Sequence, residues 1–451
     1  MDNEEKDKAS GDFPSTRFKR GKIAASTGLK MGANYARYVA RRSIGGSDSV
    51  DARKRLHRRN AEDLFSQLTK LRGTALKMAQ GLSMETSFLP SEFADVLSKA
   101  QYQVPAMNSA LVRRIIRQNL GDYPENVFAE FDPNAIAAAS LGQVHRARTK
   151  EGIDVAVKVQ YPNVRESIDS DLQLMRGIAA RFIGADAAEP YINEVGARLH
   201  EETDYVQEGN NIEFFADVYN DTNVVTPRWL PDLTTTKVLT MTFVDGVHLN
   251  ELMEGNPSQE ERDAFGQILF DFAHDQITGK HLAVHVDAHP GNFLFREDGK
   301  IGILDFGCIK RFPQKFRDDL VGLFVSTLQH NRDSVLQYYT ALDFLREDQS
   351  DEQRMFMTDI LDKATGILVE PYREDTYDFT STAVVDGFRE MIPKLTGKEA
   401  FKNRAPVGSH HFVFVNRLVL GFYSILSGLQ SRIDVTRGRD KLISSTSVVA
   451  Q

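Results

Sequence analysis

The sequence predicts an α+β protein with two lobes, a helical extension before them and a helical tail after them. Apolar residues recur at helical spacing from Ala61 to Met84. Short runs with the two-residue alternation of strands follow between residues 135 and 246. From Glu251 onward the pattern is mostly helical again, interrupted by short strand-like pieces at Phe293–Phe295 and Ile301–Leu304. The chain has 451 residues, of which 41% are hydrophobic and 26% charged, a composition that indicates a large globular protein and excludes fibrous and disordered classes.

These patterns divide the chain into six segments. In order they are a polar N-terminus expected to be disordered (1–16), a basic and amphipathic helical segment (17–60), the N-terminal helical extension (61–134), a small lobe (135–246), a large lobe (247–345) and the helical C-terminal tail (346–451).

Charge and cysteine content narrow the partners and the compartment. The net charge of −8 argues against general binding of nucleic acid, although Arg17 to Arg42 form a basic stretch without acids. That stretch either makes a peripheral contact with an anionic membrane or packs as a solvated helix on its own domain. The single cysteine, Cys308, cannot form an internal disulfide, and we expect a cytoplasmic protein without a secretory signal. The longest apolar stretch, Leu418–Leu429, is too short to span a membrane.

Four strand-like runs are expected to form the sheet of the small lobe. They are Val144–Arg148, Ile153–Val159, Val224–Arg228 and Thr236–Phe243. The turn Lys150–Gly152 joins the first two runs as a hairpin. In the second run the alternation puts Lys158 on the face opposite the valines. Helices are expected over Asp169–Ile183 and Ile192–Phe215. Before the sheet, a further helix is expected over about Ser109–Asn119, ending at Gly121.

Two short segments of the large lobe contain the residue types that phosphoryl transfer requires. Asp287 and Asn292 have the D-x-x-x-x-N spacing of a catalytic loop, and Asp305 begins a D-F-G sequence after an apolar run. A carboxylate in the loop can orient the nucleophile, while an amide oxygen and a second carboxylate can hold Mg²⁺ on the phosphates. We therefore predict that Asp287 is catalytic and that Asn292 and Asp305 are metal ligands.

The small lobe is expected to supply a cation and a cover for the phosphates. Lys158, at the end of Val155–Lys158, is predicted to face the α- and β-phosphates, with Glu208 as its partner. Where a glycine-rich loop would close over a nucleotide, the chain has alanines, which predict either a stiffer loop or the start of a helix. These residues are Ala137, Ala138, Ala139 and Ser140. Backbone groups of the strand end and the hinge after it, from Met241 through Val244 to Asp245, are expected to bind adenine.

Taken together, these segments resemble the UbiB-type atypical kinases, the family of AarF and ADCK proteins. Lys77–Gln80 resembles the K-x-G-Q element of that family, and Ala137–Ser140 resembles its alanine-rich loop. Glu202–Tyr205 resembles the E-x-D motif, and Val155–Lys158, Glu208 and the two large-lobe segments complete the set. The similarity runs from about Leu64 to Asp305 and beyond.

The resemblance implies a protein-kinase-like fold that binds ATP or ADP with Mg²⁺. It also implies that Lys77 faces Glu202 and Asp204 and takes part in catalysis, while Gln80 lines the nucleotide pocket. The family is tied to isoprenoid-quinone and membrane-lipid homeostasis, which implies a quinone precursor or a lipid as partner and a site of action at a membrane surface.

Three positions depart from the family pattern, and two other functions stay open. Ala79 stands where the family usually has glycine, Gly209 where alanine follows the helix glutamate, and Ala288 where proline is usual. The expected activity is ATP hydrolysis or phosphoryl transfer to something other than a protein side chain. The alternatives are a small-molecule kinase of the aminoglycoside or choline type, and a nucleotide-sensing, lipid-binding scaffold with little turnover.

Overall fold

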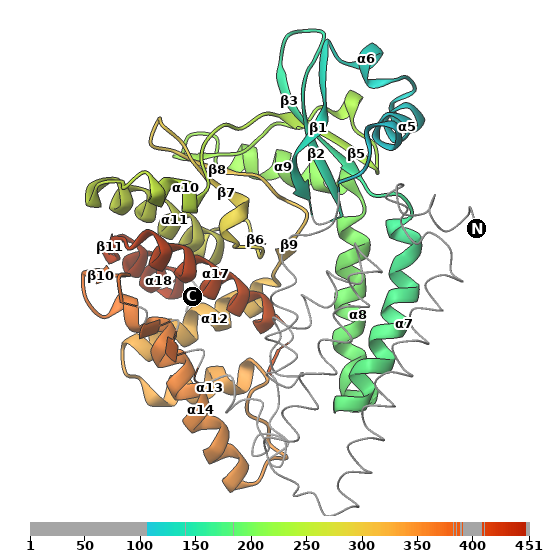
Figure 1. Cartoon of the computed structure of the whole chain (residues 1–451). Coiled ribbons are helices and arrows are strands. Elements are labelled where there is room, and N and C mark those ends of the chain that lie inside the picture. Colours follow the sequence, from blue (N-terminus) through green and yellow to red (C-terminus); the bar gives the residue numbers. More distant parts are fainter. Residues whose placement is uncertain are drawn as a thin grey trace, which may run out of the picture. The chain divides into compact units, whose positions relative to one another are not determined.

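The computed structural model describes residues 106–447 except 140, 184, 382, 385, 388–389, 391–407 and 410. These residues fall into two compact units. The first contains the described residues up to Asn210 together with Arg228–Phe243, and the second contains Asn211–Pro227 and the described residues from Val244 onward. Both combine helices with strands, as the α+β prediction requires (Figure 1). Segments 1–16 and 17–60 and most of the extension 61–134 lie outside the described residues.

The first unit is built on one antiparallel sheet with the strand order β1-β2-β3-β5. Its elements are α5 (Ser109–Leu120), α6 (Pro124–Val127), β1 (Glu130–Ala139), β2 (Gly142–Arg148), β3 (Asp154–Gln160), α7 (Val164–Ile183), α8 (Ala185–Glu202), the start of α9 (Tyr205–Val218), the short 3₁₀ helix η2 (Pro231–Leu233) and β5 (Val238–Thr242).

The β2–β3 hairpin and α5 form where the sequence predicts them. Gly152 closes the hairpin turn at φ +86°, a conformation that glycine adopts without steric cost. Gly121 ends α5 in the same left-handed region, with φ +89°, and its N–H donates to the carbonyl of Arg117. The valines of β3 are fully buried against α5 and Phe128, so the core of this unit lies on the face of the sheet away from Lys158.

Three expectations for this region were wrong. Ala137, Ala138 and Ala139 belong neither to a loop nor to a helix: they end β1 and pair with Val144, Gln143 and Gly142 of β2. Because strand pairing uses backbone groups alone, the helix preference of alanine is overridden by the ladder. The sheet therefore begins at Glu130, before residue 135, and Ser140 lies outside the described residues.

The other two corrections concern a strand and a helix. Val224–Val225 forms β4, which is outside the four-stranded sheet and pairs in parallel with β8 (Ile301–Ile303) in the second unit. The expected helix Ile192–Phe215 is two helices, because Asp204 caps a new start: its Oδ1 accepts the N–H groups of Val206 and Gln207 at 3.1 and 3.4 Å.

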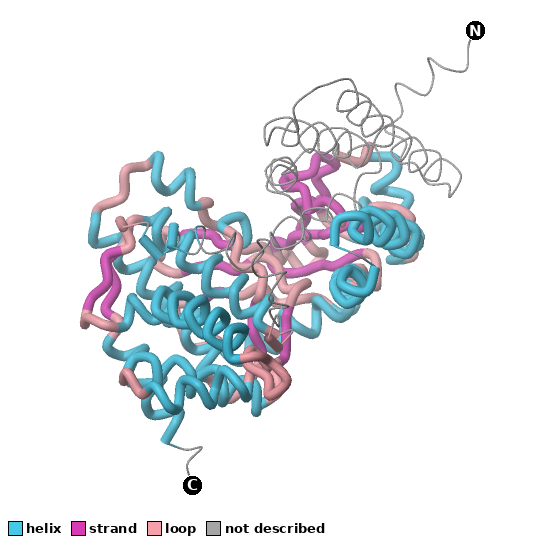
Figure 2. The backbone as a smooth tube through the Cα atoms, turned by 90° about the horizontal axis from the view of Figure 1, so that it is seen from below, coloured by secondary structure: helices cyan, strands magenta, loops and turns pink. Residues whose placement is uncertain are grey.

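The second unit is mostly helical, and its strands are short (Figure 2). After the rest of α9 its elements are β4 (Val224–Val225), α10 (Leu249–Glu254), α11 (Gln259–Thr278), β6 (Ala283–His285), η3 (Pro290–Asn292), β7 (Phe293–Phe295), β8 (Ile301–Ile303), β9 (Ile309–Arg311), α12 (Gln314–Leu328), α13 (Arg332–Ala341), α14 (Asp351–Val369), η4 (Glu370–Tyr372), β10 (Thr376–Asp378), α17 (Phe412–Leu429), β11 (Arg432–Asp434) and α18 (Thr436–Ser447).

Two small sheets in this unit are important for the site. β7 pairs with β8, and β6 pairs with β9, both antiparallel. The expected strands Phe293–Phe295 and Ile301–Leu304 are thus confirmed, the latter ending at Ile303. The tail is not wholly helical as expected, since β10 pairs with β11 across the intervening residues.

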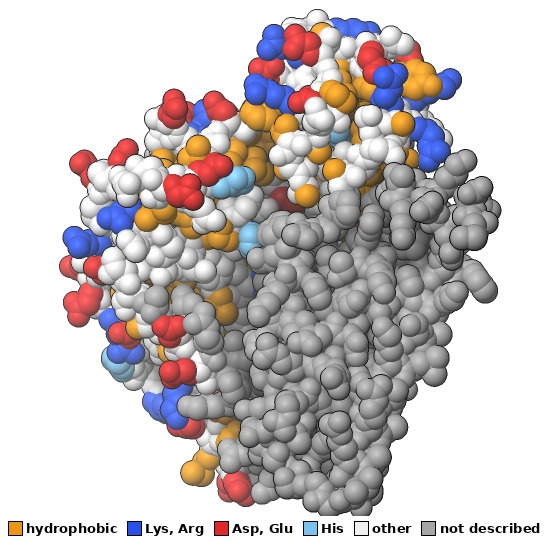
Figure 3. Space-filling view, viewed as in Figure 1, with side chains coloured by type: hydrophobic (Ala, Val, Ile, Leu, Met, Phe, Trp, Pro, Cys, Tyr) orange, Lys and Arg blue, Asp and Glu red, His pale blue; other side chains and the backbone are white. Residues whose placement is uncertain are grey.

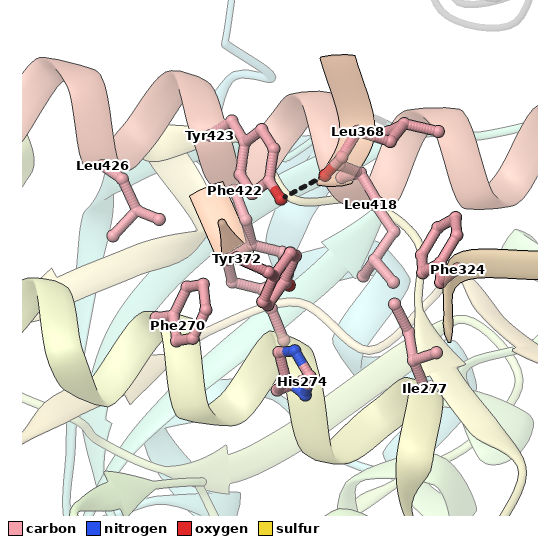
Figure 4. A pocket seen from close by; sticks show the side chains of 12 residues that line it. Phe270, His274, Ile277, Phe324, Leu368, Tyr372, Leu418, Phe422, Tyr423 and Leu426 are labelled. Carbon is pink, nitrogen blue, oxygen red and sulfur yellow. Dashed lines mark hydrogen bonds between the residues drawn. The ribbon is translucent and has the colours of Figure 1, made fainter. Parts of the chain in front are cut away.

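The helices of the second unit pack around an aromatic and aliphatic core. A cavity of about 20 Å³ remains there, lined by residues of α11, α12, α14, η4 and α17, among them His274, Tyr372 and Tyr423 (Figure 4). Tyr423 donates its hydroxyl proton to the carbonyl of Leu368 across 3.2 Å. The cavity has room for about one water molecule, so it is a packing defect of the core and too small for a nucleotide.

On the face shown in Figure 3, the described acidic and basic side chains are interspersed. None of the described helices is both long enough and apolar enough to cross a bilayer.

Candidate functional site

Lys158 and Glu208 form a buried ion pair in the first unit. The Lys158 ammonium lies 2.8 and 3.0 Å from the two carboxylate oxygens of Glu208 and donates to both. The two side chains are only 7% and 2% exposed, and the ring of Tyr205 lies 5.2 Å from the ammonium. Burial of one charge without the other would be costly, so the pair holds the lysine in one place. This is the pairing expected from the sequence.

The break between α8 and α9 selects Glu208 among the nearby acids. Asp204 uses a carboxylate oxygen to cap α9, Glu202 is the last residue of α8, and Glu208 comes one turn into α9. An Asp just before a helical run is a helix-start signal, and the sequence analysis overlooked it. Lys77 and Gln80, the residues expected to meet Glu202 and Asp204 and to line the pocket, lie outside the described residues.

Gly209 departs from the family pattern for a steric reason. The six-membered ring of Trp229 lies against its Cα, and a Cβ at this position would collide with that ring. Trp229 is the single tryptophan of the sequence and forms a β-bridge with Met241 of β5. The alanine that is usual at this position does not fit beside this tryptophan unless the ring moves.

The two residues predicted to mark the adenine site are both buried. Met241 pairs with Ala156 of β3, and Val244 packs against Gly302 of β8. Their exposed fractions are 6% and 8%, so their side chains are occupied by core contacts. The expectation that adenine is bound by backbone groups of this stretch stays a prediction.

In the second unit the strand pairing brings the two predicted catalytic segments together. The segment with Asp287 connects β6 to β7, and the segment with Asp305 connects β8 to β9. Since β7 pairs with β8 and β6 with β9, both connections lie at the same ends of these strands. The N–H of Leu304 also donates to the carbonyl of Asn292 at 3.0 Å. Since Asp305 directly follows Leu304, this hydrogen bond keeps the backbone of Asp305 close in space to that of Asn292.

The amide of Asn292 has a defined orientation. Its Nδ2 donates to the backbone carbonyl of Asp287 at 2.9 Å and to Oδ2 of the same residue at 3.0 Å. The nitrogen side therefore faces Asp287 and the Oδ1 side faces away, which is the orientation that a metal ligand needs.

Asp305 is held by its own turn. Its Oδ1 accepts the N–H of Gly307 at 2.9 Å, and its carbonyl accepts a hydrogen bond from the His285 ring. Among the described residues, no three acidic, histidine or cysteine side chains converge on one point. An amide and a carboxylate with few further protein ligands suit Mg²⁺, which completes its coordination with phosphate and water oxygens.

One contact of this site was missed by the sequence analysis. Arg417 of α17 donates from Nη2 to Oδ1 of Asp287 across 3.0 Å. The signal was present as a lone arginine within the apolar run Phe412–Leu429, in which a cation needs an acidic partner. The local pattern, however, does not predict which acid is the partner, because Asp287 lies 130 positions away in the chain.

Comparison with known proteins places this arrangement in a family. The model of the ABC1 atypical kinase-like domain matches residues 99–339. Atypical kinase COQ8, mitochondrial, from Saccharomyces cerevisiae is 29% identical over 397 residues, which cover 85% of this chain and 77% of the relative. AarF domain-containing protein kinase 1 from Mus musculus is 31% identical over 338 residues, 72% of this chain and 63% of the relative.

A solved structure agrees with the fold. The complex of Rv3197 with erythromycin from Mycobacterium tuberculosis is 26% identical, with a TM-score of 0.60 over 88% of this chain and 99% of that one. The chain spans between 38% and 69% of the length of five further curated relatives. On the evidence of the domain match and these relatives, the chain belongs to the ABC1 atypical kinase-like family, the UbiB group of AarF and COQ8 proteins, and has a kinase-like α+β fold.

Proposed function

We propose that this protein binds ATP or ADP with Mg²⁺ and either hydrolyses ATP or transfers its γ-phosphoryl group to an acceptor that is not a protein side chain. The observation that carries the proposal is the orientation of Asn292, whose amide nitrogen is taken up by Asp287 while the Leu304 hydrogen bond keeps Asp305 adjacent. Phosphoryl transfer depends mainly on positioning and on charge, and this loop provides both.

Each predicted residue has a part in this proposal. Asp287 orients the attacking hydroxyl or water, and Asn292 and Asp305 hold Mg²⁺, which when bound neutralises charge on the phosphates. Lys158 binds the α- and β-phosphates and Glu208 orients it, so the proposal requires these two residues to share one nucleotide with the Asp287 loop. Ala137–Ser140 is proposed to flank the phosphates, and the backbone from Met241 to Val244 to bind adenine.

Family membership supports a proposal for the acceptor and for the setting. We infer an isoprenoid-quinone precursor or a membrane lipid as acceptor or effector. Lys77 and Gln80, with Glu202 and Asp204, are proposed to control nucleotide use. The basic stretch 17–42 is proposed to contact an anionic membrane from the cytoplasmic side. A non-protein acceptor is supported by the alanine ladder of β1 and β2, which is less able than a glycine-rich loop to close over phosphates.

Calorimetric titration of the full chain with ADP and ATP, with and without Mg²⁺, tests the proposal. Asp305→Asn should abolish the Mg²⁺-dependent part of the nucleotide affinity. Asp298→Asn is the matched control, since Asp298 is an exposed acid in the β7–β8 turn of the same unit, paired with Arg296. An unchanged Mg²⁺ requirement in Asp305→Asn would overturn the metal assignment.

Release of ADP then tests turnover and the acceptor. Turnover should rise with quinone-precursor mimics or anionic liposomes. Activity only with aminoglycosides or choline would favour a small-molecule kinase, and binding without any ADP release would favour a nucleotide-sensing scaffold.

A further inference from the structure

Both carboxylate oxygens of Asp287 are engaged by donors from different parts of the chain. Asn292 Nδ2 donates to Oδ2 from within the same loop, at 3.0 Å. Arg417 Nη2 donates to Oδ1, also at 3.0 Å, from α17 in the C-terminal tail. The Arg417 side chain is 26% exposed and that of Asp287 36%, so the contact is partly desolvated and stronger than an ion pair on the open surface.

The seating of α17 makes this contact a fixed feature of the fold. Gly421 is one turn after Arg417 on the same helix face, and its Cα lies so close to the catalytic loop that a Cβ would collide with the carbonyl oxygen and the Cβ of Ala288. Ala288 directly follows Asp287. The same helix is anchored by Leu418, Phe422 and Leu426, which are almost completely buried. The backbone of α17 is therefore held against the loop, and the Arg417 guanidinium reaches Asp287 from a rigid support.

A second contact links α17 to the strand after the D-F-G turn. The ammonium of Lys310 in β9 lies 4.8 Å from the centre of the Phe414 ring. Phe414 and Arg417 are three positions apart and so share one face of the helix. α17 therefore touches both the loop that carries Asp287 and β9, the strand that follows the D-F-G turn.

The geometry points to Arg417 as the positioning residue of Asp287, which makes the C-terminal helix α17 a functional part of the phosphoryl-transfer site. The inference rests on the proposed function. Asn292 holds one oxygen of the carboxylate, and Arg417 holds the other, so the carboxylate plane is fixed before the acceptor arrives. A fixed carboxylate loses less rotational freedom in the transition state, and a displacement of about 1 Å can cost about 100-fold in rate.

Arginine suits this role better than lysine does. The guanidinium is planar and presents several N–H donors in a fixed fork, so it can constrain the orientation of a carboxylate. A lysine ammonium at the same place would keep the positive charge and lose that directional constraint.

The test compares the full-length wild type with Arg417→Ala, Arg417→Lys and Arg432→Ala. Arg432 is the matched control, because it is an exposed arginine of the same unit whose partner is Asp378. We expect Arg417→Ala to lower the kcat of Mg²⁺-dependent ADP release by about 10- to 100-fold, the usual effect of removing a group that orients a reacting residue. The nucleotide Kd and the KM for ATP should change by less than about 3-fold. Arg417→Lys should retain an intermediate kcat, and ethylguanidinium added to Arg417→Ala should restore part of the loss.

A double-mutant cycle with Asp287→Asn separates positioning from structural support. If Arg417 acts through Asp287, then Arg417→Ala should have little further effect on the residual kcat of Asp287→Asn. An equal further loss, or a fall in nucleotide affinity that matches the fall in kcat, would overturn the inference. Should Arg417→Ala fail to fold, Arg417→Gln keeps two amide donors and decides the same question. A wild type without Mg²⁺-dependent nucleotide binding would overturn the proposed function itself, and the inference with it.

Discussion

Removing Glu208 alone should destabilise the first unit far more than removing it together with Lys158. The ammonium is 2.8 and 3.0 Å from the two carboxylate oxygens, and the side chains are 7% and 2% exposed. Glu208→Leu removes the carboxylate that accepts both of these hydrogen bonds, and breaking a buried ion pair by removing one member costs about 3–5 kcal/mol. Lys158→Met with Glu208→Leu removes both charges, and its free energy of unfolding should return to within about 1 kcal/mol of wild type or exceed it.

The position of the single tryptophan allows this to be measured for the first unit by itself. Trp229 belongs to the Arg228–Phe243 part of that unit, and its ring packs on Gly209, the residue after Glu208. Tryptophan fluorescence during urea denaturation therefore reports the unfolding of the unit that holds the ion pair. All variants that lack Lys158 or Glu208 should also lose nucleotide affinity.

Glu201→Leu serves as the control, since Glu201 is exposed at the end of α8. It should change the free energy of unfolding by no more than about 0.5 kcal/mol. A cost below about 1 kcal/mol for Glu208→Leu would refute the reasoning, because it would mean that burial of the Lys158 charge carries little penalty. A double variant as unstable as the single one would also refute it, because the cost would then not come from removing one charge of the pair.

Two further predictions concern packing and pH. Gly209→Ala, which restores the residue usual in the family, should destabilise the first unit by about 1–3 kcal/mol and change the Trp229 emission, because the new Cβ has no room beside the ring; an unchanged emission and urea midpoint would contradict the close approach. Burial, and secondarily the positive charge of Lys441, lower the pKa of His274 from 6.5 to about 3. Between about pH 6.5 and pH 3 this histidine is therefore protonated in the unfolded chain and neutral in the folded chain. Stability should therefore fall as the pH drops through this window, by up to about 1.4 kcal/mol per pH unit, and His274→Gln should remove that part of the slope in urea titrations followed by circular dichroism. Parallel pH profiles of the two proteins would show that the histidine is charged in the folded state.

Elements with a strong local signal could be predicted from the sequence. Helix α5 has apolar residues at helical spacing and a glycine at its end, and the β2–β3 hairpin alternates on both sides of Gly152. In both cases the local pattern predicts the same element as the observed conformation, and a glycine with positive φ ends the helix or closes the turn. Tertiary contacts therefore did not change the locally preferred structure. The catalytic-loop and D-F-G spacings were equally local, and so was the family resemblance built on them.

Elements whose conformation depends on a distant partner could not be predicted. Ala137–Ala139 is a strand only because β2 lies beside it, and β4 leaves the expected sheet because its partner Ile301–Ile303 comes much later in the chain. The break before Tyr205 was the exception, since the capping aspartate was visible in the sequence. Alternation and helical spacing describe which face of an element is apolar, and they do not identify its neighbour.

By itself, the sequence determined which chemical groups this protein has available: a strand lysine, several candidate acids, and a loop with an aspartate and an asparagine at a diagnostic spacing. The tertiary structure alone decided that Glu208 is the acid that meets Lys158, that the Asn292 nitrogen faces Asp287, and that Arg417 reaches the same carboxylate from the C-terminal tail. The physical reason is that hydrogen bonds and ion pairs act over about 3 Å in space, whereas these long-range partners are 50 and 130 positions apart in the chain. Only packing of the complete fold brings such residues within that distance.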